Sequence, residues 1–302
     1  ILYSIVDSNL AKFLANTSSE KKIPCYGILG DLILSFSKLL NQKASHQPSG
    51  QYALNDEYYK RIEAIQFTMN HDDGNFVKEI KKSDIILLGV SRTSKTPTSI
   101  YLANKGFVVI SVNYRLGIGY GFEFHNPVDG GTKGASEYRD VKAAGLWLNQ
   151  QNNIDKDRIY VYGGSYGGYL TAMALGRDSD LFSGGVDIHG VHDRTLYGYL
   201  NSINYEKAPD YDLARETAWR SSPIADIDTW KSPVLIIHAD DDRNVYFKQS
   251  TDLVQRLMKK KVYMETMVIV DDTHHFMMFE NQMKVNKATA DFLIRLAEGN
   301  IN

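Results

Sequence analysis

A serine in a glycine-rich run is the first feature of the sequence that could do chemistry. Gly163, Ser165 and Gly167 match the pattern G-x-S-x-G within the run GGSYGG. The run follows a strand-like segment, residues 158–162, and precedes a segment rich in Ala, Leu and Met that favours a helix. This pattern between a strand and a helix is typical of a nucleophile elbow, a sharp turn that exposes the serine hydroxyl. We therefore predict that Ser165 is a nucleophile, with glycines on either side that let the turn close.

A serine hydroxyl needs a histidine base and a carboxylate that orients the base. Candidates follow two later strand-like segments, in the run HADDDRNV at residues 238–245 and the run DDTHHF at residues 271–276. In folds with a nucleophile elbow the chain order is serine, then acid, then histidine, as it is here. The order alone leaves open Asp240, Asp241 or Asp242 as the acid, and His274 or His275 as the base.

Strand-like and helix-like segments alternate from residue 107 to the end of the sequence. Short apolar runs predict strands at residues 107–112, 158–162, 233–237 and 262–270, and apolar periodicity predicts helices at residues 138–151, 247–261 and 281–297. The alternation predicts an α/β fold in which helices cover both faces of a parallel sheet. Active sites in such folds assemble at the carboxyl ends of the strands, where Ser165 and both candidate runs lie.

From about residue 102 onward, the chain resembles the catalytic domain of the prolyl oligopeptidase (S9) family of serine peptidases. The resemblance is carried by four stretches: GFVVISVNYR at 106–115, GGSYGG at 163–168, HxxxDxxV at 238–245 and DxH at 272–274. It implies an α/β-hydrolase-type, mostly parallel sheet with helices on both faces. It also implies a triad of Ser165, Asp242 and His274, with the backbone N–H of Tyr166 as an oxyanion donor. The implied reaction is acyl transfer from a peptide, amide or ester.

The resemblance to this family also implies that the neighbouring candidate residues have structural and not catalytic roles. It makes Asp240 and Asp241 residues of a solvated loop, and it gives His275 a rim or packing role. The remaining histidines of this part, His189, His192 and His238, are predicted to be hydrogen-bonded structural residues.

Two departures from the family pattern predict impaired activity. The family normally carries a large β-propeller ahead of this domain, and nothing here is long enough to form one. The second oxyanion donor normally comes from a tyrosine in the loop after the preceding strand, but residues 91–98, SRTSKTPT, contain no tyrosine. Removing one such donor typically lowers kcat by about 10²–10³.

That replaced loop has a possible chemistry of its own. Its sequence approximates the phosphate-binding pattern G-x-x-x-x-G-K-[ST], with a serine in place of the last glycine. In such a loop backbone N–H groups face the phosphates, the lysine neutralises charge and the threonine approaches Mg²⁺. The candidate phosphate-binding residues are Gly89, Ser91, Arg92, Thr93, Ser94, Lys95 and Thr96.

Residues 1–105 resemble the pyruvate, phosphate dikinase regulatory protein family. The resemblance is carried by LYSIVD at 2–7, YYKRIEAIQFTM at 58–69, HDDG at 71–74 and the loop run at 89–103. It implies a partial P-loop kinase-like α/β segment with ADP-dependent kinase and phosphate-dependent pyrophosphorylase chemistry, using ADP or ATP, phosphate and Mg²⁺. The chain thus has the features of a chimera, with a dikinase-regulator-like segment at 1–105 and a hydrolase domain at 106–302.

The junction between the two segments predicts a continuous sheet. Residues 84–90 favour a strand, 99–104 a short helix and 107–112 a strand, which together form a βαβ unit. This unit would stand in for the hydrolase strand and helix that normally precede residue 108. The phosphate loop would then occupy the place of the oxyanion loop.

Composition narrows the remaining classes. The 302 residues carry a net charge of −2, so no basic field predicts a nucleic-acid partner. The single cysteine, Cys25, excludes a disulfide framework and a cysteine-based zinc site. No run of 18 apolar residues and no leader pattern occur, which predicts a cytoplasmic chain with no membrane partner. Composition does not indicate the oligomeric state.

The leading hypothesis is therefore a serine hydrolase that needs no cofactor and no metal and takes a peptide or a small ester or amide as its partner. One alternative is an ADP-dependent phosphotransferase that uses Lys95 and Thr96. The other is an inactive fusion of two fragments.

Overall fold

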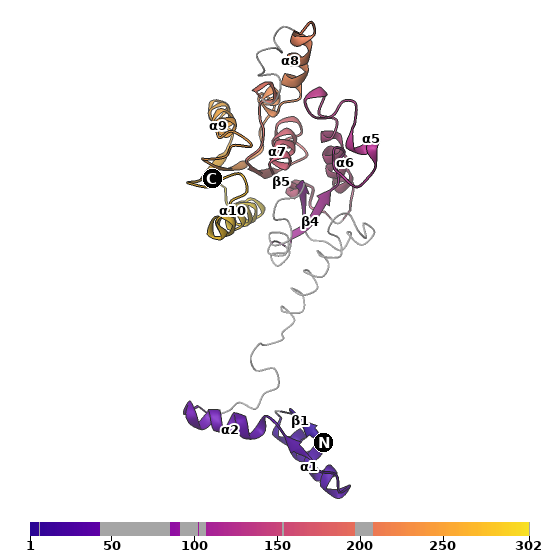
Figure 1. Ribbon diagram of the computed structural model, residues 1–302, viewed down its shortest axis with the longest axis vertical. Coiled ribbons are helices and arrows are strands. Elements are labelled where there is room, and N and C mark those ends of the chain that lie inside the picture. Colours follow the sequence, from indigo (N-terminus) through magenta and orange to yellow (C-terminus); the bar gives the residue numbers. More distant parts are fainter. Residues whose placement is uncertain are drawn as a thin grey trace. The chain divides into compact units, whose positions relative to one another are not determined.

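The computed structural model describes residues 1–5, 7–42, 85–90, 102, 107–152, 154–196 and 208–301. The chain divides into two compact units, Ile1–Ile62 and Glu63–Asn302 (Figure 1). In the part of the chain that is described, no helix is both long and apolar enough to cross a membrane.

The N-terminal unit contains two short strands and two helices in its described part. The parallel strands are β1 (Leu2–Tyr3) and β2 (Tyr26–Gly27), and the helices are α1 (Ser8–Glu20) and α2 (Gly30–Leu39). Helix α1 begins after Asp7, whose carboxylate accepts hydrogen bonds from the N–H groups of Asn9 and Leu10 at 2.8 and 2.9 Å. Such an N-cap satisfies amide groups that have no acceptor within the helix.

The C-terminal unit is built on a sheet of six parallel strands in the order β4-β3-β5-β6-β7-β8. Their bounds are β3 Ile85–Val90, β4 Phe107–Val112, β5 Tyr160–Gly164, β6 Gly184–Ile188, β7 Val234–Ala239 and β8 Met264–Ile269. From β3 the chain moves outward to β4 and then returns to the other side of β3 as β5. The strand order therefore reverses between β3 and β5, and open α/β sheets bind their ligands at such a switch point.

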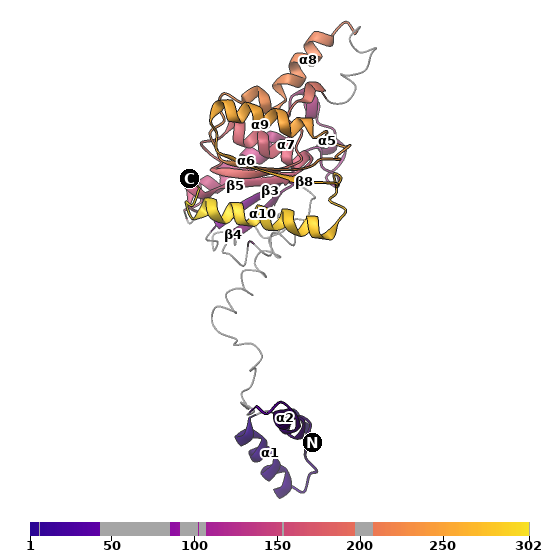
Figure 2. The same cartoon turned by 90° about the vertical axis from the view of Figure 1, so that its left-hand side faces the viewer.

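Helices cover both faces of this sheet (Figure 2). Their bounds are α5 Phe122–His125, α6 Tyr138–Asn149, α7 Tyr166–Arg177, α8 Tyr211–Arg220, α9 Lys248–Lys260 and α10 Phe279–Ala297, with short 3-10 turns η3 Gly131–Lys133, η4 Lys156–Arg158, η5 Arg194–Leu196 and η8 Pro223–Asp226. Helices α6, α7 and α9 lie on one face and α10 lies on the other. Strand β5 alternates accordingly, with Val161 in the core under α7 and Tyr160 and Tyr162 in the core on the side of α10.

The sequence predicted most of this unit, and the α/β fold class is confirmed. One strand was missed, because β6 reads GGVDI and its two glycines and aspartate do not look like a buried strand. A glycine is needed there, since a Cβ on Gly185 would lie 2.2 Å from the carbonyl oxygen of Val161. The expected pairing of residues 84–90 with 107–112 is present as parallel β3 and β4, and Leu102 between them is helical.

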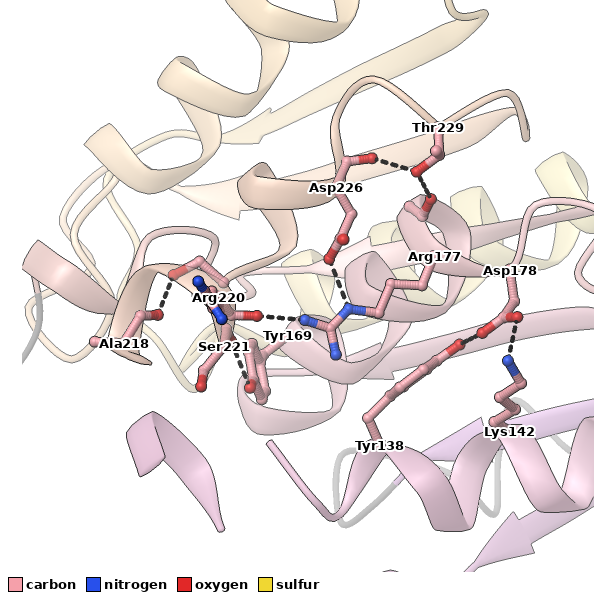
Figure 3. Close-up of polar contacts among 12 residues, drawn as sticks. Tyr138, Lys142, Tyr169, Arg177, Asp178, Ala218, Arg220, Ser221, Asp226 and Thr229 are labelled. Atoms are coloured by element: carbon pink, nitrogen blue, oxygen red, sulfur yellow. Dashed lines mark hydrogen bonds and ion pairs between the residues drawn. The ribbon is translucent and has the colours of Figure 1, made fainter. Parts of the chain in front are cut away.

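A network of polar contacts holds the C-terminal end of α7, the helix that begins at the predicted elbow (Figure 3). Arg177 donates to the carboxylate of Asp226 at 2.6 Å and also to the backbone oxygen of Arg220. Asp178 accepts from the hydroxyl of Tyr138 and, at 2.7 Å, from the ammonium of Lys142. These contacts tie α7 to α6, α8 and the turn η8.

We expect Arg177→Ala to lower the free energy of unfolding by about 1.5–3 kcal/mol, because hydrogen bonds of a charged group to partly buried partners are of that size. Urea denaturation measures this change, provided that the free energy of unfolding falls with urea concentration at the same slope in the variant and in the wild type. Arg220→Ala is the matched control, since its own ion pair with Glu216 is exposed and its backbone oxygen is kept. Equal losses in the two variants would contradict the role of the network.

Candidate active site

The sharp turn between β5 and α7 places Ser165 at the carboxyl end of the sheet. Ser165 has φ 57° and ψ −115°, a strained conformation for a residue with a side chain. Its N–H donates to the carbonyl oxygen of Ile188 at 2.9 Å, which fastens the turn to β6. A Cβ on Gly163 would lie 2.6 Å from backbone atoms of Gly167, so the two glycines touch across the turn. This is the geometry that a nucleophile elbow requires.

Tyr166 is the first residue of α7, so its backbone N–H has no acceptor within the helix. Its side chain is anchored, because the hydroxyl donates to the buried carboxylate of Glu137 at 2.6 Å. The other oxygen of Glu137 accepts from the N–H of Gly131 at 3.0 Å. Burial, followed by the charge of Glu137, raises the pKa of Tyr166. The hydrogen bond from the neutral phenol of Tyr166 to the buried carboxylate of Glu137 therefore fixes the first turn of α7.

Two of the predicted site residues meet directly. The Nδ1 of His274, after β8, lies 2.6 Å from Oδ2 of Asp242, after β7. The other carboxylate oxygen accepts from the N–H groups of Asn244 and Val245 at 2.8 and 2.9 Å. Because an ionised carboxylate only accepts, Nδ1 of His274 carries the hydrogen and Nε2 is left as the basic atom.

The surroundings of Asp242 favour its ionised form. His238 lies behind it, with Nε2 3.2 Å from Oδ2 of Asp242 and 2.9 Å from the carbonyl oxygen of Val245. Burial opposes ionisation, but the hydrogen bonds from His238, His274 and Val245 outweigh it and hold the pKa of Asp242 well below its ordinary value. Asp242 is therefore a fixed negative charge beside the imidazole of His274.

Exposure separates the neighbouring candidates as the sequence predicted. Asp240, Asp241 and His275 are exposed, whereas Asp242 and His274 are buried. Ser165 and His274 make no direct hydrogen bond with each other within the described residues. Such bonds often tighten only when substrate binds. The catalytic roles themselves stay predictions.

The prediction for His189 was wrong. His192 and His238 make hydrogen bonds as expected. Neither ring nitrogen of His189 has a hydrogen-bond partner among the described residues, although His189 is only 2% exposed. It follows Ile188 at the end of β6 with φ 42°, and its ring lies 4.1 Å from that of His274, centroid to centroid. Burial, followed by the neighbouring His274 and His238, lowers the pKa of His189 to about 2. The residue was missed because β6 was missed, so nothing placed it at the edge of the sheet where Asp242 and His274 lie.

One group of potential metal ligands occurs among the described residues. Ligand atoms of His189, Asp242 and His274 all lie within 4.8 Å of one another.

The phosphate-loop prediction falls mostly outside the described residues. Gly89 lies within β3, paired in register with Ser111 of β4 and Tyr162 of β5. Ser91, Arg92, Thr93, Ser94, Lys95 and Thr96 are not among the described residues. Val90, the last residue of β3, pairs with Gly163, two residues before Ser165. The contribution of an oxyanion donor or a phosphate site by the replaced loop stays a prediction.

The fold and site define an α/β protein with a sharp strand-to-helix turn at Ser165 and a buried acid–histidine pair. The chain belongs to the prolyl oligopeptidase family, whose model matches residues 94–300. A second model, for the kinase/pyrophosphorylase family, matches residues 1–121, so the two matches overlap between residues 94 and 121. Both resemblances drawn from the sequence are confirmed.

Solved structures support the hydrolase fold. The dipeptidyl peptidase 4 of Porphyromonas gingivalis superposes with a TM-score of 0.61 at 23% identity, covering 70% of this chain and 31% of that protein. An acylaminoacyl peptidase of Pyrococcus horikoshii superposes with a TM-score of 0.59 at 24% identity, covering 72% of this chain and 38% of that protein.

Curated relatives match the N-terminal part. A putative pyruvate, phosphate dikinase regulatory protein of Pelagibacter ubique is 72% identical over 112 residues, or 37% of this chain and 41% of that protein. The corresponding protein of Brucella anthropi is 44% identical over 118 residues, or 39% of this chain and 43% of that protein. The chain therefore spans about two fifths of the length of these relatives.

Proposed function

We propose that the chain is a serine hydrolase that cleaves peptide, amide or ester bonds through Ser165, Asp242 and His274. The observation that carries the proposal is the 2.6 Å contact between His274 Nδ1 and Asp242 Oδ2, at the same edge of the sheet as the strained Ser165 turn. A serine on a strained turn and a histidine oriented by a carboxylate, at one edge of the sheet, are the groups that nucleophilic catalysis by serine uses.

The reaction follows from the roles of these atoms. The Oγ of Ser165 attacks the substrate carbonyl while Nε2 of His274 takes the hydroxyl proton. The N–H of Tyr166 donates to the oxyanion that forms. His274 returns the proton to the leaving amine or alcohol, and water then releases the acyl group by the same steps in reverse order. Asp242 stays ionised throughout and holds the imidazole in the tautomer that leaves Nε2 basic.

The family supports a broad substrate class, namely peptides and their amide or ester analogues. Two solved structures with this fold are a dipeptidyl peptidase and an acylaminoacyl peptidase, so short peptides and their amide or ester analogues are the first substrates to test. The chemistry needs no cofactor. A cytoplasmic location and the absence of nucleic-acid and membrane partners belong to the same proposal.

Labelling of the full chain with a fluorophosphonate probe tests the proposal. Wild-type protein should be labelled, Ser165→Ala should not be labelled, and His274→Ala should be labelled at least about 10³-fold more slowly because it lacks the base. His275→Ala is the matched control, since it removes the exposed neighbour of His274 and should label normally. A wild-type chain that melts cooperatively but is not labelled, or labelling that survives in Ser165→Ala, contradicts the proposal.

A second candidate function is favoured by the 72% identity of the N-terminal part to a putative pyruvate, phosphate dikinase regulatory protein. It would be ADP-dependent phosphotransfer with Lys95 on the phosphates and Thr96 toward Mg²⁺. Calorimetry with ADP and Mg²⁺, with Lys95→Ala as the comparison, tests it. A chain that neither binds ADP nor reacts with the probe would be the inactive fusion of two fragments.

A further inference from the structure

His189 is a buried polar residue that the proposed reaction does not use. Within the part of the chain that the structure describes, neither ring nitrogen has a hydrogen-bond partner, and only 2% of the residue is exposed. Leaving a buried polar group without a partner costs about 1–3 kcal/mol, so a residue of this kind calls for an explanation. Its backbone, at φ 42°, is also in a region that residues with side chains rarely adopt.

The position of His189 points to a ligand. Its ring packs on that of His274 with centroids 4.1 Å apart, and ligand atoms of His189, Asp242 and His274 lie within 4.8 Å of one another. Two imidazoles and one carboxylate are a donor set that Zn²⁺ and related transition-metal ions prefer, whereas Mg²⁺ and Ca²⁺ prefer oxygen ligands. Histidine binds such ions through an unprotonated ring nitrogen.

We propose that His189, Asp242 and His274 form a binding site for a divalent transition-metal ion such as Zn²⁺, and that the bound ion inhibits the hydrolase. The inhibition rests on the proposed function, whereas the binding does not.

The site needs only a local adjustment to hold the ion. A tetrahedral Zn²⁺ with bonds of about 2.0–2.1 Å spaces its ligand atoms about 3.3 Å apart. His274 Nδ1 and Asp242 Oδ2, now 2.6 Å apart, would therefore separate slightly, and His189 would move toward them by at most about 1.5 Å. The side chain of His274 is 8% exposed, which leaves a route for the ion and a place for water as the fourth ligand. The ion replaces the hydrogen that His274 Nδ1 donates to Asp242, and that proton leaves to solvent.

The bound ion would inhibit because it takes over two groups of the triad. Asp242 could no longer orient the imidazole, and His274 coordinated to a cation would be a weaker base for Ser165. His189 distinguishes this site from an ordinary acid–histidine pair, since the third ligand makes the site selective for a metal ion.

Titration of the metal-free full chain with Co²⁺, followed by its visible absorption, tests the binding. We expect one tetrahedral Co²⁺ per chain, and an affinity at least about 10-fold lower in His189→Phe, which keeps a stacking ring, and in His189→Asn, which tolerates positive φ. His275→Asn is the matched control and should bind within about twofold of the wild type. Thermal melts establish that each variant is folded, and His274→Ala removes a second of the three proposed ligands.

Inhibition is measured separately. Zn²⁺ should slow fluorophosphonate labelling of the wild type. The His189 variants should need a Zn²⁺ concentration at least about 10-fold higher for the same fractional slowing, with each variant compared with its own metal-free rate. Co²⁺ binding that is kept when His189 is replaced, or a folded wild type that binds no Co²⁺, overturns the site. Binding that depends on His189 in a chain that the probe never labels supports the site and contradicts the hydrolase.

Discussion

Replacing Asp242 by Asn is expected to lower the rate of hydrolysis by about 10⁴, the size of the loss seen when the acid of a serine–histidine–acid triad becomes an amide. The structure supplies the reason. Oδ2 of Asp242 faces two donors, Nδ1 of His274 at 2.6 Å and Nε2 of His238 at 3.2 Å. An amide NH₂ in that place would meet hydrogens, so His274 would move its hydrogen to Nε2 and lose its basic atom. The Oδ1 of the amide could still accept from Asn244 and Val245, which keeps the loop intact.

The measurement is the rate constant of fluorophosphonate labelling or of hydrolysis of an activated ester, with a thermal melt as the test of folding. Asp241→Asn is the control, because it removes the same charge from the exposed neighbour and should change the rate less than twofold. If both variants slowed equally, the effect would be one of overall charge and the triad assignment would fail.

The sharp turn at Ser165 and the contact between Asp242 and His274 are as the sequence led us to expect, whereas one strand of the sheet around them is not. The glycine pattern and the two acid–histidine runs each follow an apolar strand, which pointed to Ser165 and to the two runs, and the resemblance to the prolyl oligopeptidase family then singled out Asp242 and His274. Strand β6 could not be recognised, because GGVDI owes its burial to its neighbours: only a glycine fits at Gly185, where a Cβ would lie 2.2 Å from the Val161 oxygen. The position of His189 at the edge of the sheet was not predicted either, because it depends on strand β6.

The junction between the two family segments shows that the sheet can include a strand from the segment that resembles the other family. Strand β3 lies in the part matched by the kinase/pyrophosphorylase model and before the start of the prolyl oligopeptidase match at residue 94. It nevertheless pairs in parallel with β4 on one side and β5 on the other. Strand pairing is made by backbone groups, and the apolar run IILLGV suits a strand in the middle of a parallel sheet. A sheet position can therefore be filled by a strand from the segment that resembles the other family.

We expect a large effect on the free energy of unfolding from a buried histidine–aspartate pair, His192 and Asp187, next to the site. His192 Nε2 lies 2.5 Å from Oδ2 of Asp187, and its Nδ1 lies 3.0 Å from the carbonyl oxygen of Gln249. Both partners are acceptors, so the ring carries both hydrogens. Burial opposes that charge, but Asp187 outweighs it and raises the pKa of His192. Asp187→Ala should lower the free energy of unfolding by about 3–5 kcal/mol, because it leaves a buried cation without its partner.

Asp187→Asn should cost less than Asp187→Ala, because the amide can donate to Nε2 of a neutral His192 while Nδ1–H still donates to Gln249. The two variants also differ from the wild type in pH dependence. A pKa raised on folding gives stability that is fully present below the unfolded value of about 6.5 and is lost as pH rises through the folded value. Wild-type stability should therefore fall as pH rises above about 6.5, by up to about 1.4 kcal/mol per pH unit, and this component should be absent in Asp187→Asn. Urea denaturation at several pH values measures both effects, and parallel pH profiles for the wild type and Asp187→Asn would show that His192 is neutral in the folded protein.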